Sequence, residues 1–271
     1  MANNVPVGVP KALTTKVALI TGSLGGIGFE IGLALARKGC AVVLNGIGDT
    51  SSSEAQLARL REAGGDGFFH GADISDSSQI EDMVAAVLAR YGRIDILVNN
   101  AVTRFDANMD VLPVDKWTQA VAVNLTAPFH LSRLTLPGMK ARDWGRIINL
   151  SSIYGVTGTA GRGDYVVTKH GLIGMTKVIA LECAGTGVTC NALCPGAVET
   201  PHIKQLMVTR ALAAGLSVED FTRQFLEPRQ PSKRFVQPDK VGALAAFLCT
   251  DDACDITGAT LPIDGGWQAR G

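Results

Sequence analysis

Thr21-Gly22-Ser23-Leu24-Gly25-Gly26-Ile27-Gly28 is the stretch that decides the fold of this chain. It follows from an apolar run at residues 16–21 and leads directly into a helical pattern at residues 26–38. Glycines at such a turn let the backbone bend tightly and approach a pyrophosphate, which then accepts from free N–H groups at the positive end of the helix. The spacing is G-x-x-x-G-x-G, because Ile31 stands where the common G-x-G-x-x-G pattern has its third glycine. A glycine-rich turn can also serve only to pack a helix on a strand, but its place between the first strand and the first helix favours a dinucleotide.

Short apolar runs alternate with helix-length amphipathic stretches along the whole chain. We expect strands at residues 16–21, 41–45, 94–99, 146–151, 188–194 and 259–263. We expect helices at residues 26–38, 77–91, 115–140, 165–183 and 238–249. The strand runs are apolar throughout, which is typical of parallel strands covered by helices on both faces. The sequence therefore predicts an α/β fold of Rossmann type, with a doubly wound parallel sheet between two layers of helices.

The chain is expected to form one domain over residues 16–271, preceded by a flexible N-terminal lead-in at residues 1–15. Neither a repeat nor a low-complexity linker divides it. Residues 201–238 contain several prolines and mixed charge, and they are too many for an ordinary connection. We expect this segment to be a lid over the site.

Composition excludes several classes of function. Lys+Arg 25 balance Asp+Glu 25, so the chain has no global positive field for nucleic acid or an anionic membrane surface. No stretch reaches the roughly 20 apolar residues of a spanning helix, and residues 1–15 do not resemble a secretory signal, so we expect a cytoplasmic protein without membrane contact. The 6 cysteines include no C-x-x-C pair, which indicates reduced core thiols and no metal site.

Three side chains suggest the chemistry. Tyr165 and Lys169 are in an i, i+4 relation within a predicted helix, so they share one face. Ser152 follows the buried strand at 146–151, at the edge where open α/β sheets bind ligands. A secondary alcohol loses a proton as its hydride leaves, and a tyrosine of pKa about 10 must fall toward 7 to take that proton. Such a shift corresponds to roughly 4 kcal/mol, which Lys169 and a nicotinamide cation can supply while Ser152 holds the substrate oxygen.

With these residues in place, the sequence resembles the short-chain dehydrogenase/reductase family from Thr14 to the last residue. The resemblance is carried by the glycine turn, Asn99-Asn100-Ala101, Asn124, Ser152, Tyr165, Lys169 and Pro195-Gly196. It implies a single domain with a sheet of about seven parallel strands in the doubly wound order, and usually a homotetramer. It also implies that Asp73 lies beside the adenine and that Asn124 holds a water linking Lys169 to solvent. Without the family, Asp73 is equally a turn residue and Asn124 a polar group inside a helix.

The resemblance assigns site residues one by one. The catalytic residues would be Ser152, Tyr165, Lys169 and Asn124. The cofactor would be contacted by Gly22, Ser23, Gly26, Ile27, Gly28, Asn45, Asp73, Ile74, Asn100, Ala101, Tyr165, Lys169, Pro195, Gly196, Val198 and Thr200.

The expected cofactor is NAD rather than NADP. After the second strand the chain reads Asn45-Gly46-Ile47-Gly48-Asp49, with no Lys or Arg before Arg59 and none at residues 23–25. A 2′-phosphate would find no cationic partner there. The acidic residue that usually binds the ribose hydroxyls is replaced by Asn45, and Asp49 can equally cap the following helix.

Within the family the sequence is most similar to the 3-hydroxybutyrate dehydrogenases, but its substrate pocket differs. Where that subfamily carries a Gln after N-N-A-G, a His after the catalytic Ser and a Lys before the catalytic Tyr, this chain has Arg104, Tyr154 and Arg162. The Trp that follows P-G is replaced by Ala197, and Val102 stands at the last glycine of N-N-A-G. Arg104, Tyr154, Arg162 and Ala197, together with Ser152, would bind the substrate. Two arginines in one pocket call for a negative group, so we expect a small anionic substrate.

Three functions remain open at this stage. The first is an NAD-dependent dehydrogenase that oxidises the secondary hydroxyl of an anionic hydroxy acid. The second is a dehydrogenase of an anionic sugar or polyol, such as a sugar acid or a sulfonated sugar of the sulfoquinovose type, which an enlarged pocket would admit. The third is a non-catalytic NAD-binding protein; Val102 alone supports it, and the intact Ser152, Tyr165 and Lys169 oppose it.

Overall fold

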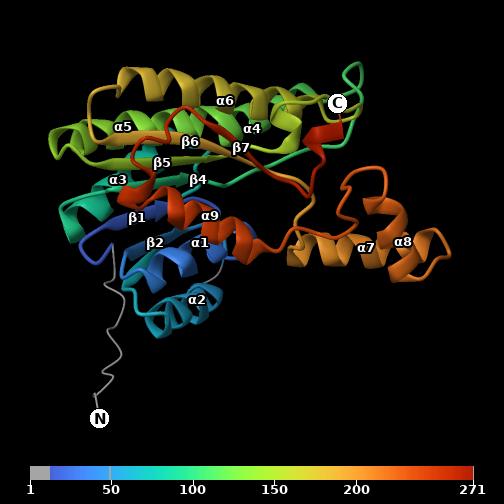
Figure 1. Ribbon diagram of the computed structural model, residues 1–271, viewed down its shortest axis with the longest axis horizontal. Coiled ribbons are helices and arrows are strands. Elements are labelled where there is room, and N and C mark those ends of the chain that lie inside the picture. The colour runs from blue at the N-terminus through green and yellow to red at the C-terminus, as the bar shows by residue number, and fades with distance from the viewer. Residues whose placement is uncertain (1–12, 49, 271) are drawn as a thin grey trace, which may run out of the picture.

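The computed structural model describes residues 13–48 and 50–270 and contains a seven-stranded sheet in the order β3-β2-β1-β4-β5-β6-β7 (Figure 1). All neighbouring strands pair in parallel. The order reverses between β1 and β4, which is the switch point where ligands bind in doubly wound sheets. The strands are β1 (Val17–Ile20), β2 (Ala41–Asn45), β3 (Gly67–His70), β4 (Ile96–Asn99), β5 (Gly145–Leu150), β6 (Val188–Pro195) and β7 (Thr260–Ile263).

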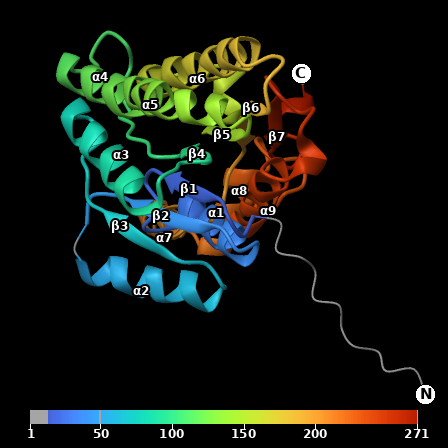
Figure 2. The ribbon, with the colours of Figure 1, turned by 90° about the vertical axis from the view of Figure 1, so that its left-hand side faces the viewer.

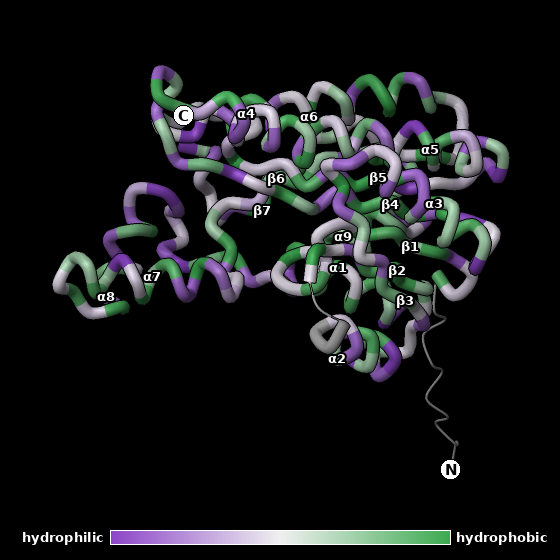
Figure 3. Tube along the Cα trace, turned by 180° about the vertical axis from the view of Figure 1, so that it is seen from behind, coloured by the Kyte–Doolittle hydropathy of each residue, from purple (hydrophilic) through white to green (hydrophobic). Residues whose placement is uncertain are grey.

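Helices cover both faces of the sheet, as Figure 2 shows from the side. α1 packs against α9 and α2 on one face, while α3, α5 and α6 cover the other, and each face has its own buried hydrophobic cluster. The apolar strands β1 and β4 lie between them, and their hydrophobic colour is clear in Figure 3. The helices are α1 (Gly26–Arg37), α2 (Thr50–Glu62), α3 (Ser77–Tyr91), α4 (Val114–Val121), α5 (Ala127–Ala141), α6 (Gly163–Glu182), α7 (Pro201–Ala213), α8 (Val218–Leu226) and α9 (Pro238–Leu248).

The structure differs from the expected elements in three places. The strand β3 and the helix α2 were not predicted, because β3 is a short glycine-flanked edge strand and α2 begins in a serine-rich, polar stretch. The helix expected at residues 115–140 is divided into α4 and α5 by a π-helical turn at Ala122–Thr126. Residues 201–238 contain the helices α7 and α8, which extend side by side beyond the sheet in Figure 1.

The lead-in was expected at residues 1–15, but the structure describes residues 13–15 and packs Leu13 into the domain. Leu13 is 2% exposed within the core, and its N–H donates to Lys38 O at 3.0 Å. The domain therefore begins before residue 16; residues 1–12 and the expected cap Asp49 lie outside the described residues. The six cysteines are all free, and only Cys254 is exposed. Within the described chain, no helix is long and apolar enough to cross a membrane, and no group of three or more His, Cys, Asp or Glu side chains could hold a metal ion.

Candidate active site

A cavity of about 1440 Å³ lies at the carboxyl ends of β1, β4, β5 and β6. One end is lined by the glycine turn, by Asn45 at the end of β2 and by Asp73. The other end is lined by residues after β5 and by the segment that carries α7 and α8. The parallel sheet therefore brings to one cavity almost every motif that the sequence analysis selected.

The glycine turn is held against the residue that follows β4. Gly22 has φ +61°, and the side-chain amide of Asn100 donates to Thr21 O at 2.9 Å and to Gly22 O at 2.8 Å. A Cβ at Gly28 would lie 2.5 Å from Asn100 Nδ2, so glycine is required where helix α1 passes this amide. The turn thus keeps its backbone close to the cavity and leaves the start of α1 facing it.

Most of the residues expected to contact the cofactor line the cavity, and two do not. The hydroxyl of Ser23 donates to Ile20 O at 2.7 Å, and both Ser23 and Gly28 lie behind the turn, so they support its shape. Asn45 reaches the wall, but its amide donates to His70 O and Ala72 O and so ties β2 to β3. Those lining the cavity are Gly22, Gly26, Ile27, Asn45, Asp73, Ile74, Asn100, Ala101, Tyr165, Lys169, Pro195, Gly196, Val198 and Thr200.

Ser152, Tyr165 and Lys169 converge on this cavity. Ser152 begins a short 3₁₀ helix after β5, and its hydroxyl accepts from Tyr154 N at 3.2 Å and is hydrogen-bonded to Tyr165. Lys169 is 2% exposed; its ammonium donates to Leu150 O and lies 5.6 Å from the centre of the Tyr165 ring. The i, i+4 spacing in α6 therefore places the phenol and the ammonium on the same wall, as the sequence predicted.

The pKa of Tyr165 reflects opposing influences. Burial raises it above its ordinary value, while the hydrogen bond with Ser152 and the nearby charges of Arg104 and Arg162 lower it. Burial also lowers the pKa of Lys169, to about 8. Sequence reasoning assigned the lowering of the Tyr165 pKa to Lys169, whereas here Ser152 and the two arginines act in that direction. Arg104 and Arg162 therefore act on the pKa of Tyr165 as well as lining the cavity beside it.

Asn124 lies in the π-helical turn and connects two walls of the cavity from behind. Its side-chain oxygen accepts from Thr103 N at 2.9 Å, and its amide donates to Thr103 O at 2.8 Å and to Thr168 Oγ1 at 3.2 Å. These bonds fix the loop after β4 relative to helix α6. π-helical turns are often found at functional sites, because the extra residue redirects a side chain. The expected link from Asn124 to Lys169 stays a prediction.

The substrate end of the cavity is rich in guanidinium groups. Arg104 and Arg162 both line it, and Arg104 Nη2 lies 3.4 Å from His202 Nε2 while Arg162 Nε lies 3.3 Å from Asp106 Oδ1. Sequence reasoning missed Arg210 and Arg229, which line the same end from the expected lid. The signal that could have found them is the placement of basic residues in a lid segment that follows Pro195-Gly196.

Tyr154 stands at the centre of this end. Its ring is in edge contact with those of Tyr165 and Trp267, with centroids 6.4 Å and 5.6 Å apart, and the Arg162 guanidinium lies 5.9 Å from its centre. Ala197 lines the wall and leaves space beside it, while Trp267 was not selected from the sequence. Val102 also lines the cavity and is 47% exposed.

Comparison with known proteins assigns this chain to a family. The family model described as Enoyl-(Acyl carrier protein) reductase matches residues 22–268. A D-beta-hydroxybutyrate dehydrogenase of Cupriavidus necator is 45% identical over 258 residues, covering 95% of this chain and 100% of that protein. This chain belongs to the short-chain dehydrogenase/reductase family. It is an oxidoreductase of that family, whose members bind a nicotinamide cofactor.

Other members of the short-chain dehydrogenase/reductase family agree in sequence and in fold. A D-beta-hydroxybutyrate dehydrogenase of Rhizobium meliloti is 41% identical and covers 94% of this chain and 100% of its own length. The L-sorbose reductase from Gluconobacter frateurii, complexed with NADPH and L-sorbose, matches with TM-score 0.91 at 28% identity, covering 96% of this chain and 99% of that one. The expected fold class is therefore confirmed, and the similarity to hydroxybutyrate dehydrogenases that the sequence suggested is confirmed as well.

Proposed function

We propose that this protein is an NAD-dependent dehydrogenase that oxidises the secondary hydroxyl of a small anionic hydroxy acid. The observation that supports this most is the position of Arg104 and Arg162 on the wall next to Tyr165. Each charge-assisted hydrogen bond from a guanidinium to a carboxylate or sulfonate contributes roughly 1.5–3 kcal/mol. A substrate held by these arginines would have its hydroxyl within reach of Ser152 and Tyr165.

The residues of the cofactor end fit a dinucleotide. Gly22 lines the cavity, and a Cβ there would lie 2.7 Å from Ala101 Cα, so the turn presents bare backbone to the ligand at this point. Gly22, Gly26 and Ile27 would face the pyrophosphate, Asp73 and Ile74 the adenine, and Lys169, Pro195 and Gly196 the nicotinamide side.

NAD is favoured over NADP by the charge of the ribose end. Asn45, Gly46, Ile47 and Asp73 line that end, and among the described residues every Lys or Arg of the cavity wall lies at the opposite end. A 2′-phosphate would therefore be desolvated without a cationic partner.

The roles of the chain's own groups follow from their positions. Arg104 and Arg162 bind the negative group and orient the substrate. Ser152 donates a hydrogen bond to the substrate oxygen, and ionised Tyr165 takes the hydroxyl proton. Ser152, Arg104 and Arg162 favour the ionised form of Tyr165, and Lys169 lies beside its ring on the nicotinamide side of the cavity. When bound, the nicotinamide supplies the chemistry of accepting the hydride, so the alcohol loses two electrons and two hydrogens.

The substitution Tyr165→Phe tests the chemistry. We expect NADH formation from NAD and a hydroxy acid to fall at least about a hundredfold, because the proton then has no acceptor. Binding of NADH should be almost unchanged, since the phenol contributes little to holding the cofactor. Tyr91→Phe is the matched control, because Tyr91 bonds to Asp66 on the surface away from the cavity. Substantial turnover in Tyr165→Phe would contradict the assignment.

Removal of either arginine tests the anionic substrate. We expect Arg104→Ala or Arg162→Ala to raise KM at least about tenfold for the best anionic substrate, equivalent to about 1.4 kcal/mol, and less for neutral alcohols. Arg90→Ala is the control, since Arg90 pairs with Asp66 on the surface and does not line the cavity. The assay uses a panel of 3-hydroxy acids, sugar acids, sulfonated sugars and neutral alcohols. Wild-type KM in both variants, or a neutral best substrate, would exclude the anion pocket.

An anionic sugar or polyol is the second candidate substrate. Ala197 opens one wall, and Tyr154 adds a hydroxyl to the same end of the cavity, which suits a hydroxylated body larger than a four-carbon acid. The same panel separates the two, because sugar acids or sulfonated sugars would then have the highest kcat/KM.

A homotetramer is also proposed. α5 and α6 cover the same face of the sheet and expose Phe129, Val178 and Leu181 at 51%, 53% and 77%. Apolar side chains exposed on one face are typical of an interface. Sedimentation should give a particle of four chains of 28.4 kDa each; a monomer at micromolar concentration would contradict this.

A further inference from the structure

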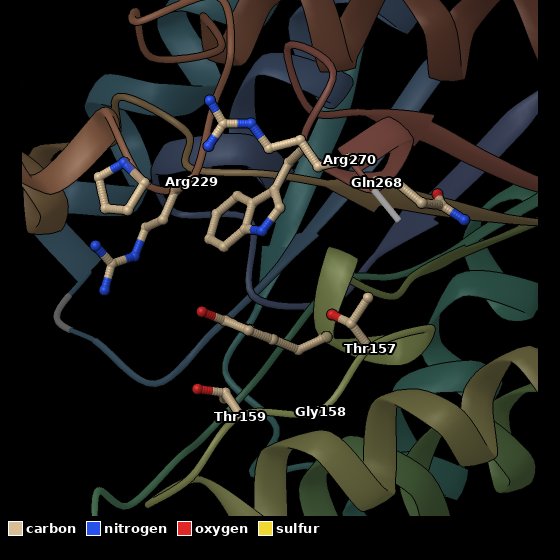
Figure 4. A pocket seen from close by; sticks show the side chains of 9 residues that line it. Thr157, Gly158, Thr159, Arg229, Gln268 and Arg270 are labelled. Carbon is tan, nitrogen blue, oxygen red and sulfur yellow. The ribbon is translucent and has the colours of Figure 1, made fainter.

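A second hollow of about 390 Å³ adjoins the catalytic cavity (Figure 4). The two share Tyr154, Thr159, Arg229 and Trp267, so they lie side by side with these residues between them. In Figure 4 the labelled Arg229 and Arg270 lie on one side of the hollow, with Thr157 and Thr159 across from them. Its full lining is Tyr154, Thr157, Gly158, Thr159, Pro228, Arg229, Trp267, Gln268 and Arg270.

The lining of this hollow carries positive charge and no negative charge. Arg229 and Arg270 are its charged members, and no Asp or Glu belongs to it. Among the described residues neither guanidinium forms an ion pair within 4.0 Å, although exposed arginines elsewhere in the chain do. Two guanidiniums without a carboxylate form a site that favours an anion.

Both guanidiniums are held in place by backbone carbonyls. Arg229 Nη1 donates to Phe225 O at 2.8 Å, and its guanidinium lies 4.4 Å from the centre of the Phe225 ring. Arg270 Nη1 donates to Glu227 O at 3.1 Å. These bonds use one N–H of each guanidinium, so the remaining N–H groups stay available for a ligand.

We propose that this hollow binds a second negative group at the far end of the substrate, so that the enzyme acts on dianions such as hydroxydicarboxylates. The inference rests on the proposed function, in which Arg104 and Arg162 hold the first negative group. Tyr154 connects the two places, because its ring contacts Tyr165, Trp267 and Arg162. A chain lying across Tyr154 would reach from the reacting hydroxyl to Arg229 and Arg270.

The test compares 3-hydroxy acids that end in a methyl group with those of equal chain length that end in a second carboxylate. For wild-type protein, kcat/KM should favour the dicarboxylate at least about tenfold at one chain length, which is about 1.4 kcal/mol. Arg270→Gln and the double variant Arg229→Gln/Arg270→Gln should lower kcat/KM for that dicarboxylate at least about tenfold, and far less for the methyl-ended acid. Arg223→Gln is the control, because Arg223 lies on α8, pairs with Asp220 and does not line either hollow.

The variant Arg270→Gln keeps the test decisive if the change at Arg229 disturbs folding. Arg270 is exposed next to the last residue, whereas Arg229 anchors the end of α8. If the dicarboxylate is never preferred, or if Arg270→Gln and the double variant both keep the wild-type preference, the second subsite does not exist.

Failure of the proposed function gives a different result. Adipate, which has two carboxylates and no hydroxyl, is titrated calorimetrically into the protein with NADH. If adipate binds and this binding is lost when Arg229 and Arg270 are replaced, the anion subsite exists. If no hydroxy acid is turned over at the same time, the proposed reaction is wrong. Adipate inhibition that is not competitive with the methyl-ended acid would show an effector site and overturn the dianion proposal.

Discussion

Tyr165 lies among groups that act on its proton in opposite directions. Burial raises the pKa of its phenol, while Ser152, Arg104 and Arg162 lower it. In the proposed reaction the same two guanidiniums hold the substrate anion, and that anion partly cancels their charge. Binding of the correct substrate therefore changes the base that acts on it, which couples substrate choice to the proton step.

The pH dependence of turnover follows from these directions. Oxidation needs ionised Tyr165 and the pKa of its phenol is raised, so kcat/KM for oxidation should rise with pH, while that for reduction should fall. Arg162→Gln removes a charge that lowers this pKa, so the rise should move to higher pH. Arg90→Gln, on the surface, should leave the profile unchanged. Profiles of kcat/KM for both directions check this; a shift of the Arg162→Gln curve to lower pH would contradict it.

The central residues of the site could be predicted from the sequence, as could Arg104, Tyr154 and Arg162 of its outer wall, whereas the rest of that wall could not. Ser152, Tyr165 and Lys169 follow from one strand end and one helical turn, both of which are local patterns. Arg210, Arg229 and Trp267 come to the same cavity from distant segments. Their positions depend on how the segment 201–238 and the chain end fold back, which no local spacing encodes.

At the scale of single elements, the helix that carries Asn124 differs most from expectation. Residues 115–140 have one continuous helical pattern, and the apolar period does not reveal the π-helical turn at Ala122–Thr126. The turn brings the buried amide of Asn124 to Thr103 and Thr168. The turn is thus matched by tertiary contacts that a local pattern does not encode. β3 was missed for a related reason, since an edge strand of four residues is defined by its pairing with β2.

The contact between α1 and α9 depends on Gly242. A Cβ at this position would lie 2.6 Å from Glu30 O, a backbone atom of α1 that cannot move alone. We expect Gly242→Ala to destabilise the protein by about 1–3 kcal/mol, more than the gain of up to about 1 kcal/mol in helix propensity. Gly174→Ala in α6, where nothing lies within 4 Å of the new Cβ, should instead stabilise it slightly. Thermal unfolding measures both, and an equal rise in Tm would contradict the packing argument.

The segment 201–238 is expected to close over the bound ligands. The C-terminal part of this segment is tied to the turn after β6, because Val236 N donates to Ala197 O at 2.9 Å and the Gln230 side chain accepts from Ala197 N. Its helices α7 and α8 extend beyond the sheet, where Lys204, Arg210 and Arg223 are sites for trypsin (Figure 1). The free protein should be cut there first, and NAD plus substrate should slow this cleavage. Equal cleavage with and without ligands would exclude closure.

On the scale of the whole molecule, the net charge is zero, but the charges along the cavity wall are unevenly distributed. The 25 cationic residues balance 25 anionic ones, yet four arginines line one end of the cavity and Asp106 is the acidic residue among them. The ribose end has no cation in the part of the wall that the structure describes. Composition bears only on the net charge of the chain, whereas the local field at the cavity depends on the fold, which brings arginines from separate regions of the chain together.

The absence of a cation at the described ribose end predicts how much NAD and NADP each raise the Tm of the protein. A ligand at about a hundred times its Kd stabilises the folded state by about 2.7 kcal/mol, which raises Tm by several degrees for a protein of this size. We expect NAD to give such a rise and NADP at equal concentration a smaller one, because the 2′-phosphate would meet Ile47 and Asp73 without a cation. Ile47→Arg, at a side chain 79% exposed, should increase the response to NADP, and Ile47→Gln should not. A wild-type Tm rise with NADP that equals or exceeds the rise with NAD would show that a different part of the molecule binds the phosphate.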